Sequence, residues 1–356
     1  MAEREKDSRI EELYQEGRKI YSFSKLNTID QCEYSAYQTY IKHDRGINSV
    51  YGVLGGKTHD TLEQIMNGTA TKDELLPAIQ GELDELDMLG LAFPKDFRGG
   101  DSIRNRWIQN MSLFARDFMP FKGRFLTEQL VIYRAEHNRA LIGYADYIRF
   151  NLDGTVSIGD HKTSSWFKDE DLTHHGRQGI AYALGLEQMG YKVRDFHWHM
   201  LKFCTVRYLD KRGNEIVKNP ERSKLFLTIK NPVSKALNAL GIEELEQEYL
   251  MNEFEKTNSL AGMPQEIRDA FKVTPCLRYY ELTDERKDEF LSYFHRTAGR
   301  FEELEQDVSK PWQPVTIDKS NCFFCNSLCG FRKRCPAIAE YNRISLIKSA
   351  NDDDIF

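Results

Sequence analysis

Asp146, Asp160 and Lys162 are the residues of this chain whose types and spacing most clearly suggest chemistry. Two runs rich in strand-forming residues lie on either side of Asp153-Gly154, a pattern typical of a β-hairpin. If the loop has three residues and ends with Gly154 in a left-handed conformation, Asp146 pairs with Asp160 across the hairpin. Because side chains alternate along a strand, Asp160 and Lys162 share one face. The pattern predicts two carboxylates and one ammonium in a single patch.

Such a patch is chemically costly unless a cation occupies it. Two nearby carboxylates repel each other and lose hydration, and a bridging cation relieves both costs. A small set of oxygen ligands suits Mg²⁺ or Mn²⁺, which also bind phosphate oxygens. A lysine beside the metal can stabilise developing charge, or help to orient or deprotonate a water molecule. These residues indicate metal-assisted hydrolysis of a phosphodiester, and an exposed hairpin with scattered charges is the alternative.

Helices on either side of the hairpin are expected to complete the patch. His59 and Glu63 are four residues apart in a helical pattern before the hairpin, and Gln178 and Tyr182 are four apart after it. Residues four apart lie on one face of a helix, so each pair can present two side chains to the same place.

Taken together, the motifs G-x-x-x-H-x-x-L-E, G-x-x-D, D-x-K-T and Q-x-x-x-Y resemble the RecB-type branch of the PD-(D/E)XK nuclease superfamily. Each motif alone has little specificity, whereas all of them in this order are specific. The matching residues are Gly55, His59, Leu62, Glu63, Gly143, Asp146, Asp160, Lys162, Thr163, Gln178 and Tyr182.

The resemblance implies a role for the matching residues. In this family the histidine and the two acidic residues hold the metal, which implies His59, Asp146 and Asp160 as ligands here. The carbonyl of the residue after the second acid, His161, often adds a ligand. The lysine of the family is catalytic, which implies the same for Lys162. The residues that would position the substrate strand and the active site are Gln178 and Tyr182.

The same resemblance implies an α/β fold. Its restriction-endonuclease-like core is a mixed sheet flanked by helices, here with helical insertions and a C-terminal cysteine-rich metal cluster. The implied activity is that of a DNA nuclease that uses Mg²⁺ or Mn²⁺ to hydrolyse phosphodiester bonds. Many members cut DNA from an end, which implies an exonuclease of recombination or repair, phage or cellular, acting on single strands or duplex ends. A non-catalytic DNA-binding module of the same fold is the alternative.

A cysteine-rich segment near the C-terminus is the second signal. It contains Cys322, Cys325, Cys329 and Cys335, and four cysteines this close in a cytosolic chain indicate a metal site. A zinc site could use all four of these cysteines. Alternatively, a cluster could take one ligand from the distant Cys32.

The second arrangement resembles the iron–sulfur nucleases of the family, the AddB subunit of bacterial recombination nucleases and the CRISPR adaptation nuclease. In those proteins one cysteine precedes the histidine motif and three lie near the C-terminus. The resemblance implies a 4Fe–4S cluster that joins the two chain ends, and structural Zn²⁺ stays the alternative because the spacing departs from the usual C-x-x-C-x₅-C. The implied ligands are Cys32, Cys322, Cys325 and Cys335, with Cys329 as the alternate.

Composition restricts where DNA could bind and where the protein works. The formal net charge is −6, so a DNA-binding surface must be a local basic groove. The chain has no long apolar run and no signal-peptide pattern at its charged start. We therefore expect a soluble, cytoplasmic protein with no membrane partner, in which the cysteines are thiols or metal ligands.

The pattern of charge and hydrophobicity predicts the organisation of the chain. Strands are expected at 126–135, 140–150, 155–162 and 196–208, and one helix is expected at 24–41, around Cys32. The expected regions are a charged helical lead-in (1–20), the first part of the nuclease core (21–70), a helical insertion (71–120), the catalytic core (121–230), a helical region (231–310), a cysteine-rich iron–sulfur staple (311–345) and an acidic tail (346–356).

The last residues of the chain are three acids followed by Ile355 and Phe356. They resemble the C-terminal tip of bacterial single-strand DNA-binding proteins, which docks an aromatic ring and its carboxylate into a basic-rimmed pocket. An adaptor that recruits replication or repair proteins through this tip is therefore a further alternative. A solvated acidic terminus explains the same residues.

Overall fold

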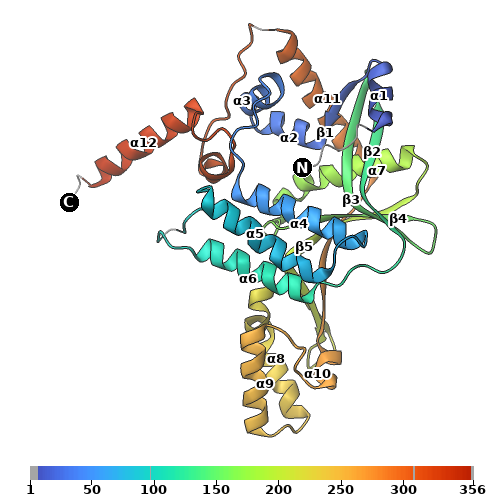
Figure 1. Ribbon diagram of the computed structural model, residues 1–356, viewed down its shortest axis with the longest axis vertical. Helices are drawn as coiled ribbons and strands as arrows, with labels where there is room; N and C mark the ends of the chain where they lie inside the picture. The colour runs from blue at the N-terminus through green and yellow to red at the C-terminus, as the bar shows by residue number, and fades with distance from the viewer. Residues whose placement is uncertain (1–6, 97, 308, 354–356) are drawn as a thin grey trace.

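The computed structural model describes residues 7–353 apart from residues 97 and 308, with side chains described as far as residue 345. Within this part of the chain, seven strands form one mixed sheet with helices on both sides (Figure 1). The strands are β1 (Lys19–Ser22), β2 (Phe125–Ala135), β3 (Arg139–Phe150), β4 (Val156–Lys162), β5 (Val193–Leu209), β6 (Glu215–Lys218) and β7 (Lys272–Tyr280). The four predicted strands are confirmed as β2 to β5, and the expected α/β class with them.

The sheet has a gap along one edge of β3, in the middle of that strand. The strand order is β1-β3-β4-β5-β6, with β2 also on β3 and β7 also on β5. β2 covers one edge of β3 over almost its whole length, so β1 and β4 share the other edge. β1 pairs there with residues 139–142 and β4 pairs with residues 147–150. Among the described residues, 143–146 have no strand partner on that edge, and this gap gives other elements access to β3.

Helices from distant parts of the sequence enclose the sheet. The helices are α1 (Ser8–Gln15), α2 (Phe23–Gln31), α3 (Glu33–Ala36), α4 (Val50–Met66), α5 (Leu75–Met88), α6 (Ser102–Asp117), α7 (Leu172–Gln188), α8 (Leu225–Ala239), α9 (Glu244–Thr257), α10 (Gln265–Ala270), α11 (Asp284–Gln306) and α12 (Pro336–Asp353). α7 packs on β2 to β5 and on β7, and α2 and α11 pack on α7. α4, α5 and α6 form a separate layer that reaches the sheet through β2 and β5.

Each layer has its own buried core. Phe196 and Trp198 of β5 pack with Phe290 of α11 in the core beneath α7. Trp107 and Met111 of α6 pack in the core shared by α4, α5 and α6. α4 belongs to one layer and α7 to the other, and side chains from both reach the gap in β3.

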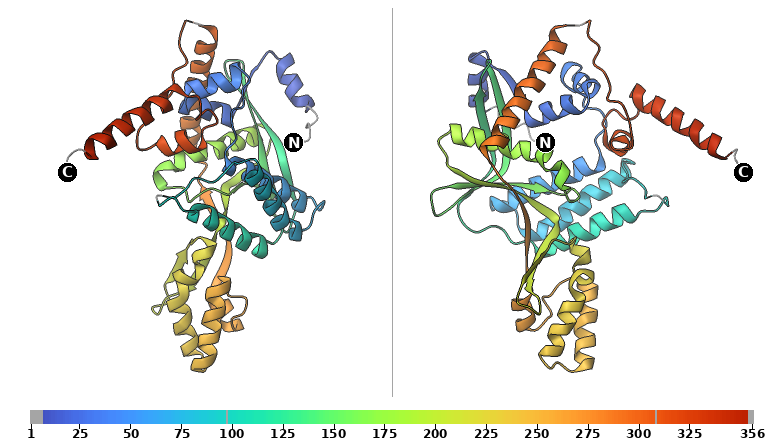
Figure 2. Two further views of the ribbon diagram at one scale, coloured as in Figure 1. Left: turned by 60° about the vertical axis from the view of Figure 1, so that its left-hand side comes forward. Right: turned by 180° about the vertical axis from the view of Figure 1, so that it is seen from behind.

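Two parts extend away from this body. α8, α9 and α10 form a lobe with the outer ends of β5 to β7, around a core of Ile229, Val233 and Phe254 (Figure 2). α12 projects in another direction from the cysteine-rich segment (Figure 1). Within the described residues, none of the helices is both long and apolar enough to cross a bilayer. The predicted binding tip, Ile355-Phe356, lies outside the described residues.

The helix expected at 24–41 is wrong as one continuous element. α2 ends at Gln31, Cys32 is extended with φ −166° and ψ 108°, and α3 begins at Glu33. A π-helical turn, Tyr37–Ile41, follows. The break separates Cys32 from both helices, so its side chain can leave the helical surface. The region 231–310, expected to be helical, also contains β7, which joins the sheet beside β5.

Candidate active site

The β3–β4 hairpin places its two acidic residues as the sequence predicts. The antiparallel ladder reaches the pair Tyr147–Gly159, and Gly154 closes the loop with a φ of 79°, a left-handed conformation that suits glycine. One further step in the same register sets Asp146 opposite Asp160. This step falls in the gap of β3, so both carboxylates lie where the sheet is open.

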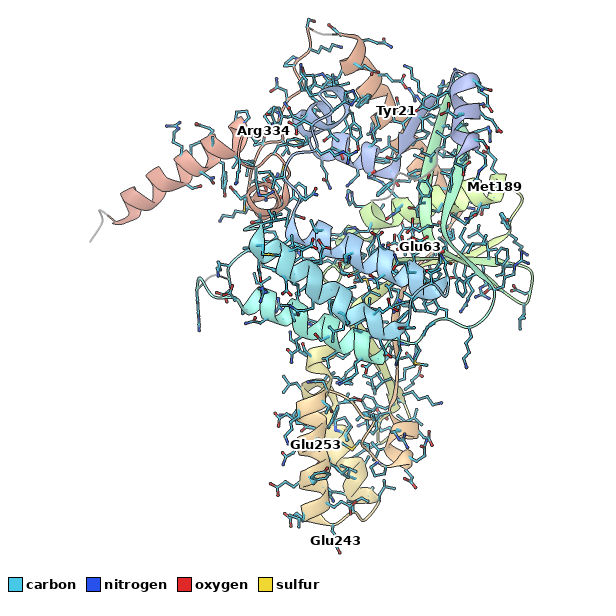
Figure 3. All side chains as sticks on the ribbon, in the orientation of Figure 1. Tyr21, Glu63, Met189, Glu243, Glu253 and Arg334 are labelled. Atoms are coloured by element: carbon cyan, nitrogen blue, oxygen red, sulfur yellow. The ribbon has the colours of Figure 1, made fainter. Side chains whose placement is uncertain are left out.

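Asp146 is held by two donors from different elements. Its Oδ2 accepts a hydrogen bond of 2.6 Å from the backbone N–H of His161 on β4. The same oxygen lies 3.2 Å from Nδ1 of His59, which α4 carries into the gap (Figure 3, where Glu63 marks α4). Burial opposes ionisation of Asp146, but the hydrogen bond and charge of His59 lower the pKa of Asp146 to about 2. The site therefore holds Asp146 as a carboxylate.

Asp160 is the more deeply buried of the two acids, with 2% of its surface exposed. Burial raises its pKa, and the charge of Lys162 opposes that rise. The Lys162 Nζ lies 2.6 Å from Asp160 Oδ2, yet no aligned hydrogen-bond donor reaches that oxygen. Burial lowers the pKa of Lys162, but the two nearby carboxylates raise it by more. Asp160 and Lys162 thus share one face of β4, as the alternation of the strand predicts.

Gln178 and Tyr182 connect this lysine to β3. Lys162 Nζ donates to Gln178 Oε1 at 3.4 Å, and Gln178 Nε2 donates to the Tyr182 hydroxyl at 3.0 Å. The hydroxyl in turn donates to the Tyr144 carbonyl at 2.7 Å. Tyr182 can lie this close because β3 has Gly143 there, where an added Cβ would be 2.6 Å from the ring. α7 therefore fixes the lysine through a chain of hydrogen bonds.

The ring of His161 has different surroundings from its backbone. It is 3% exposed and lies among the rings of Phe121, Tyr147 and His199, with centroids 5.1 to 6.3 Å apart. Neither ring nitrogen has a hydrogen-bond partner. Burial lowers the pKa of His161 to about 3, so the imidazole is neutral. The contact of His161 with the acidic pair is made by its backbone N–H.

The donor atoms at this site fit a hard divalent cation. His59 offers an imidazole nitrogen, and Asp146 and Asp160 offer carboxylate oxygens, which suit Mn²⁺ and Mg²⁺. The buried Asp160 Oδ2 lacks an aligned hydrogen-bond donor and has Lys162 Nζ 2.6 Å away. Among the described residues, however, no group of three or more His, Cys, Asp or Glu side chains is already arranged to hold a metal ion. The carboxylates pair instead with His59 and Lys162.

A cavity of about 520 Å³ opens beside this cluster. His59, His161, Lys162 and Thr163 form one side of it. Residues that the sequence did not single out form the rest, among them Tyr51, Arg106, Trp107, Lys202, Glu221 and Phe323. They come from α4, α6, β5, the segment after β6 and the cysteine-rich segment, so no local pattern could have grouped them.

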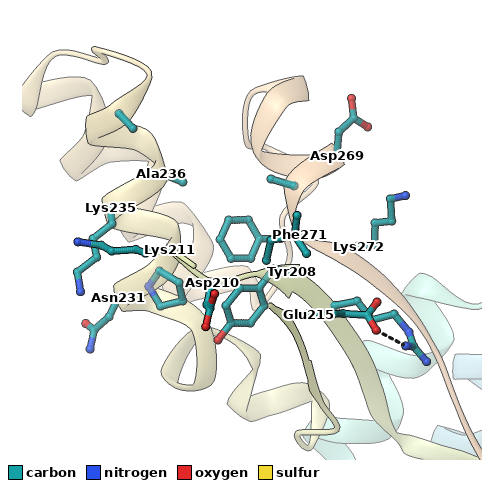
Figure 4. A pocket seen from close by; sticks show the side chains of 15 residues that line it. Tyr208, Asp210, Lys211, Glu215, Asn231, Lys235, Ala236, Asp269, Phe271 and Lys272 are labelled. Carbon is teal, nitrogen blue, oxygen red and sulfur yellow. Dashed lines mark ion pairs between the residues drawn. The ribbon is translucent and has the colours of Figure 1, made fainter. Parts of the chain in front are cut away.

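A second, larger cavity of about 800 Å³ lies in the projecting lobe (Figure 4). Tyr208 and Phe271 line it together with Lys235 of α8. It contains none of the predicted site residues. The larger of the two cavities therefore lies away from the predicted site residues.

The cysteine-rich segment lies against the part of the chain that contains Cys32. The Ile47 N–H donates to the Gly330 carbonyl at 2.8 Å, and Tyr34 packs edge-on to Phe331 with centroids 6.5 Å apart. Asp44 forms an ion pair with Arg334, which marks this segment in Figure 3. Residues 34–47 and 330–334 therefore lie side by side near the cysteines.

The thiols themselves are close enough to influence one another. Burial and the fields of Cys329, Cys32, Cys335 and Cys322, in decreasing order, raise the pKa of Cys325 to about 11. The Cys329 sulfur accepts a 3.4 Å hydrogen bond from the Phe331 N–H and lies 3.9 Å from Ser35 Oγ. All of these cysteines are free thiols. A converging set of thiols fits an iron–sulfur cluster or zinc, although no metal-holding group of three is already formed among the described residues.

Comparison with known proteins adds one finding. The model of the PD-(D/E)XK nuclease superfamily matches residues 20–336, which is most of the chain. The match includes the hairpin, both flanking helices and the cysteine-rich segment. No curated protein is similar enough to the chain to count as a match.

Proposed function

Because the chain belongs to the PD-(D/E)XK nuclease superfamily, whose members cleave phosphodiester bonds and typically use Mg²⁺ or Mn²⁺, we propose that it is a DNA exonuclease of the RecB-like branch. The observation that carries the proposal is the meeting of Asp146, Asp160, Lys162 and His59 at the gap in β3. A role in recombination or repair is part of the same proposal.

In this proposal His59, Asp146 and Asp160 would hold the divalent cation, and the family resemblance adds the carbonyl of His161 as a further ligand. When bound there, the cation would stabilise charge at the phosphate and lower the pKa of a bound water. The gap in β3 suits this role, because α4, β3 and β4 each bring one of these side chains to it.

The chain's own contribution to the reaction comes from Lys162. Its ammonium lies beside Asp160, where it can stabilise the negative charge that develops on a phosphate oxygen. Gln178 holds the ammonium and Tyr182 holds Gln178 against β3. Orientation is therefore established before substrate binds, which lowers the cost of reaching the transition state.

The cysteine-rich segment has a structural role in this proposal. We propose that Cys32 and three of the C-terminal cysteines hold a 4Fe–4S cluster, with zinc as the alternative metal. Support comes from the contacts between residues 34–47 and 330–334 and from the mutual influence of the thiols. A cluster shared by these segments would close a loop of almost the whole chain and stabilise the fold.

An activity assay tests the proposal. Asp160→Asn should lower the rate of DNA hydrolysis in Mn²⁺ by about a thousandfold, because it removes a ligand charge without changing shape. Asp60→Asn, an exposed acid on α4 next to His59, is the matched control and should leave the rate unchanged. Hydrolysis by Asp160→Asn at the wild-type rate would refute the active site.

Exonuclease action has its own test. Linear single strands should be degraded and closed circular single strands of the same sequence should survive, because only the former have ends. Equal cleavage of the two substrates would show an endonuclease and would overturn this part of the proposal while leaving the active site intact.

A further inference from the structure

The 520 Å³ cavity beside Lys162 has features that metal binding does not explain. Lys202 of β5 lines it and is only 8% exposed. Among the described residues, no carboxylate lies within ion-pair distance of the Lys202 ammonium. Burial lowers the pKa of Lys202 to about 8, although Glu221 acts in the opposite direction. A buried ammonium without an ion-pair partner is costly, and an anion in the cavity would remove that cost.

Other donors line the same cavity. Arg106 of α6 lies 3.9 Å from Glu221, a separation that leaves most of its hydrogen-bonding capacity unused. Trp107 is 3% exposed, and its Nε1 has no hydrogen-bond partner. Ser164 and Ser165, which follow β4, add hydroxyl groups. Two cations and several neutral donors thus line a space that also has Lys162 in its wall, and the one carboxylate among the described lining residues, Glu221, lies 3.2 Å from Lys224.

Two apolar residues of the cavity lining come from the cysteine-rich segment. Phe323 and Leu328 line the cavity, and Phe323 has 51% of its surface exposed. An exposed aromatic ring beside a cationic wall matches the two parts of a nucleotide, because bases stack on aromatic rings and phosphates pair with Lys and Arg.

We propose that this cavity binds the nucleotide next to the scissile phosphate, with Lys202 and Arg106 on its phosphate and Phe323 against its base. This inference rests on the proposed nuclease function and adds to it the residues that hold the substrate strand. It also gives the cysteine-rich segment a second task, since Phe323 reaches the cavity only while that segment stays folded against residues 34–47.

The test measures binding and cleavage of a fluorescent single-stranded oligonucleotide. Lys202→Met keeps the length of the side chain and removes its charge. Arg106→Gln removes the charge on α6 with a shorter polar side chain, and Phe323→Ala removes the ring. The matched controls are Arg104→Gln, whose arginine pairs with Asp87 and does not line the cavity, and Phe324→Ala, whose ring is also exposed but does not line it.

Each of the three cavity variants should raise KM by about tenfold while kcat changes by less than about twofold. The Kd measured by fluorescence anisotropy without divalent metal should rise by a similar factor. Loss of either cation should also reduce the slope of log Kd against log salt by about 0.7, the value for one phosphate contact on a single strand. The two controls should match the wild type in every measurement.

Unchanged KM, Kd and salt dependence in folded Arg106→Gln and Phe323→Ala would overturn the inference, even if Lys202→Met failed to fold. If the wild type binds the oligonucleotide without metal but hydrolyses no DNA in Mg²⁺ or Mn²⁺, the nuclease proposal fails and the Kd values alone decide on the cavity. If the wild type neither binds nor hydrolyses DNA, both proposals fail.

Discussion

The β3–β4 hairpin and the cysteine-rich segment both gather chemically active side chains, but they are built in opposite ways. In the hairpin, backbone register places Asp146 opposite Asp160, and ion pairs already compensate both charges. The cysteines come from two segments far apart in the sequence, at Cys32 and at residues 322–335, and are free thiols. The hairpin therefore holds its geometry without a metal, whereas the proposed metal of the cysteine site would supply much of that site's stability.

Replacement of Cys32 is expected to have the largest effect on the cysteine site. Cys32→Ala should remove bound iron, bleach the visible absorption and lower the unfolding temperature, because the metal is proposed to join the chain ends. Cys276→Ala, which alters a buried thiol on β7, should keep its iron. Iron and zinc are measured by elemental analysis. Normal metal content in Cys32→Ala would confine the metal to the C-terminal cysteines.

A smaller difference is expected between Cys322 and Cys329, the two candidates for the fourth ligand of the metal. Cys329 influences the pKa of Cys325 more than Cys322 does, and its sulfur accepts the Phe331 N–H. Cys329→Ala should therefore lose more iron than Cys322→Ala, although the sequence favoured Cys322. Anaerobic purification and iron analysis of both variants give the answer. The reverse order would restore Cys322 as the ligand.

Low pH is expected to destabilise the sheet beside the hairpin, and this effect is smaller still. His199 is 1% exposed beside Phe114 and Phe121, and burial holds its pKa well below the ordinary value. An unfolded histidine has a pKa of about 6.5, so below that pH the unfolded state binds the extra proton. The free energy of unfolding then falls as pH decreases, by about 1.4 kcal/mol per pH unit for this residue.

His199→Leu should therefore flatten the fall in unfolding temperature between pH 6.5 and pH 5. His137→Asn, at an exposed turn, is the control and should keep the wild-type pH dependence. Thermal denaturation at several pH values measures both. An equal fall in wild type and His199→Leu would mean that His199 does not determine acid sensitivity.

The sequence predicts the hairpin well, but it predicts neither the backbone at Cys32 nor the residues of the cavity. Alternation along the strands and the Gly154 turn determine the register of β3 and β4, and both predictions are confirmed because they depend on local backbone geometry. The break at Cys32 was missed because local helical propensity continues through it, while tertiary contacts decide the backbone there. Lys202 and Arg106 had no signal, since only the packing of α6 beside β5 brings them to one cavity.

The positions of the hairpin residues do not by themselves establish their catalytic roles, so a kinetic measurement must test them. The most direct test is single-turnover cleavage of an end-labelled oligonucleotide in Mn²⁺ by wild type and Lys162→Met, with Mn²⁺ affinity measured by calorimetry. The account predicts a fall of about a thousandfold in the cleavage rate with Mn²⁺ affinity retained, because Lys162 stabilises charge and is not a ligand. Cleavage by Lys162→Met at the wild-type rate would contradict the proposed catalytic site.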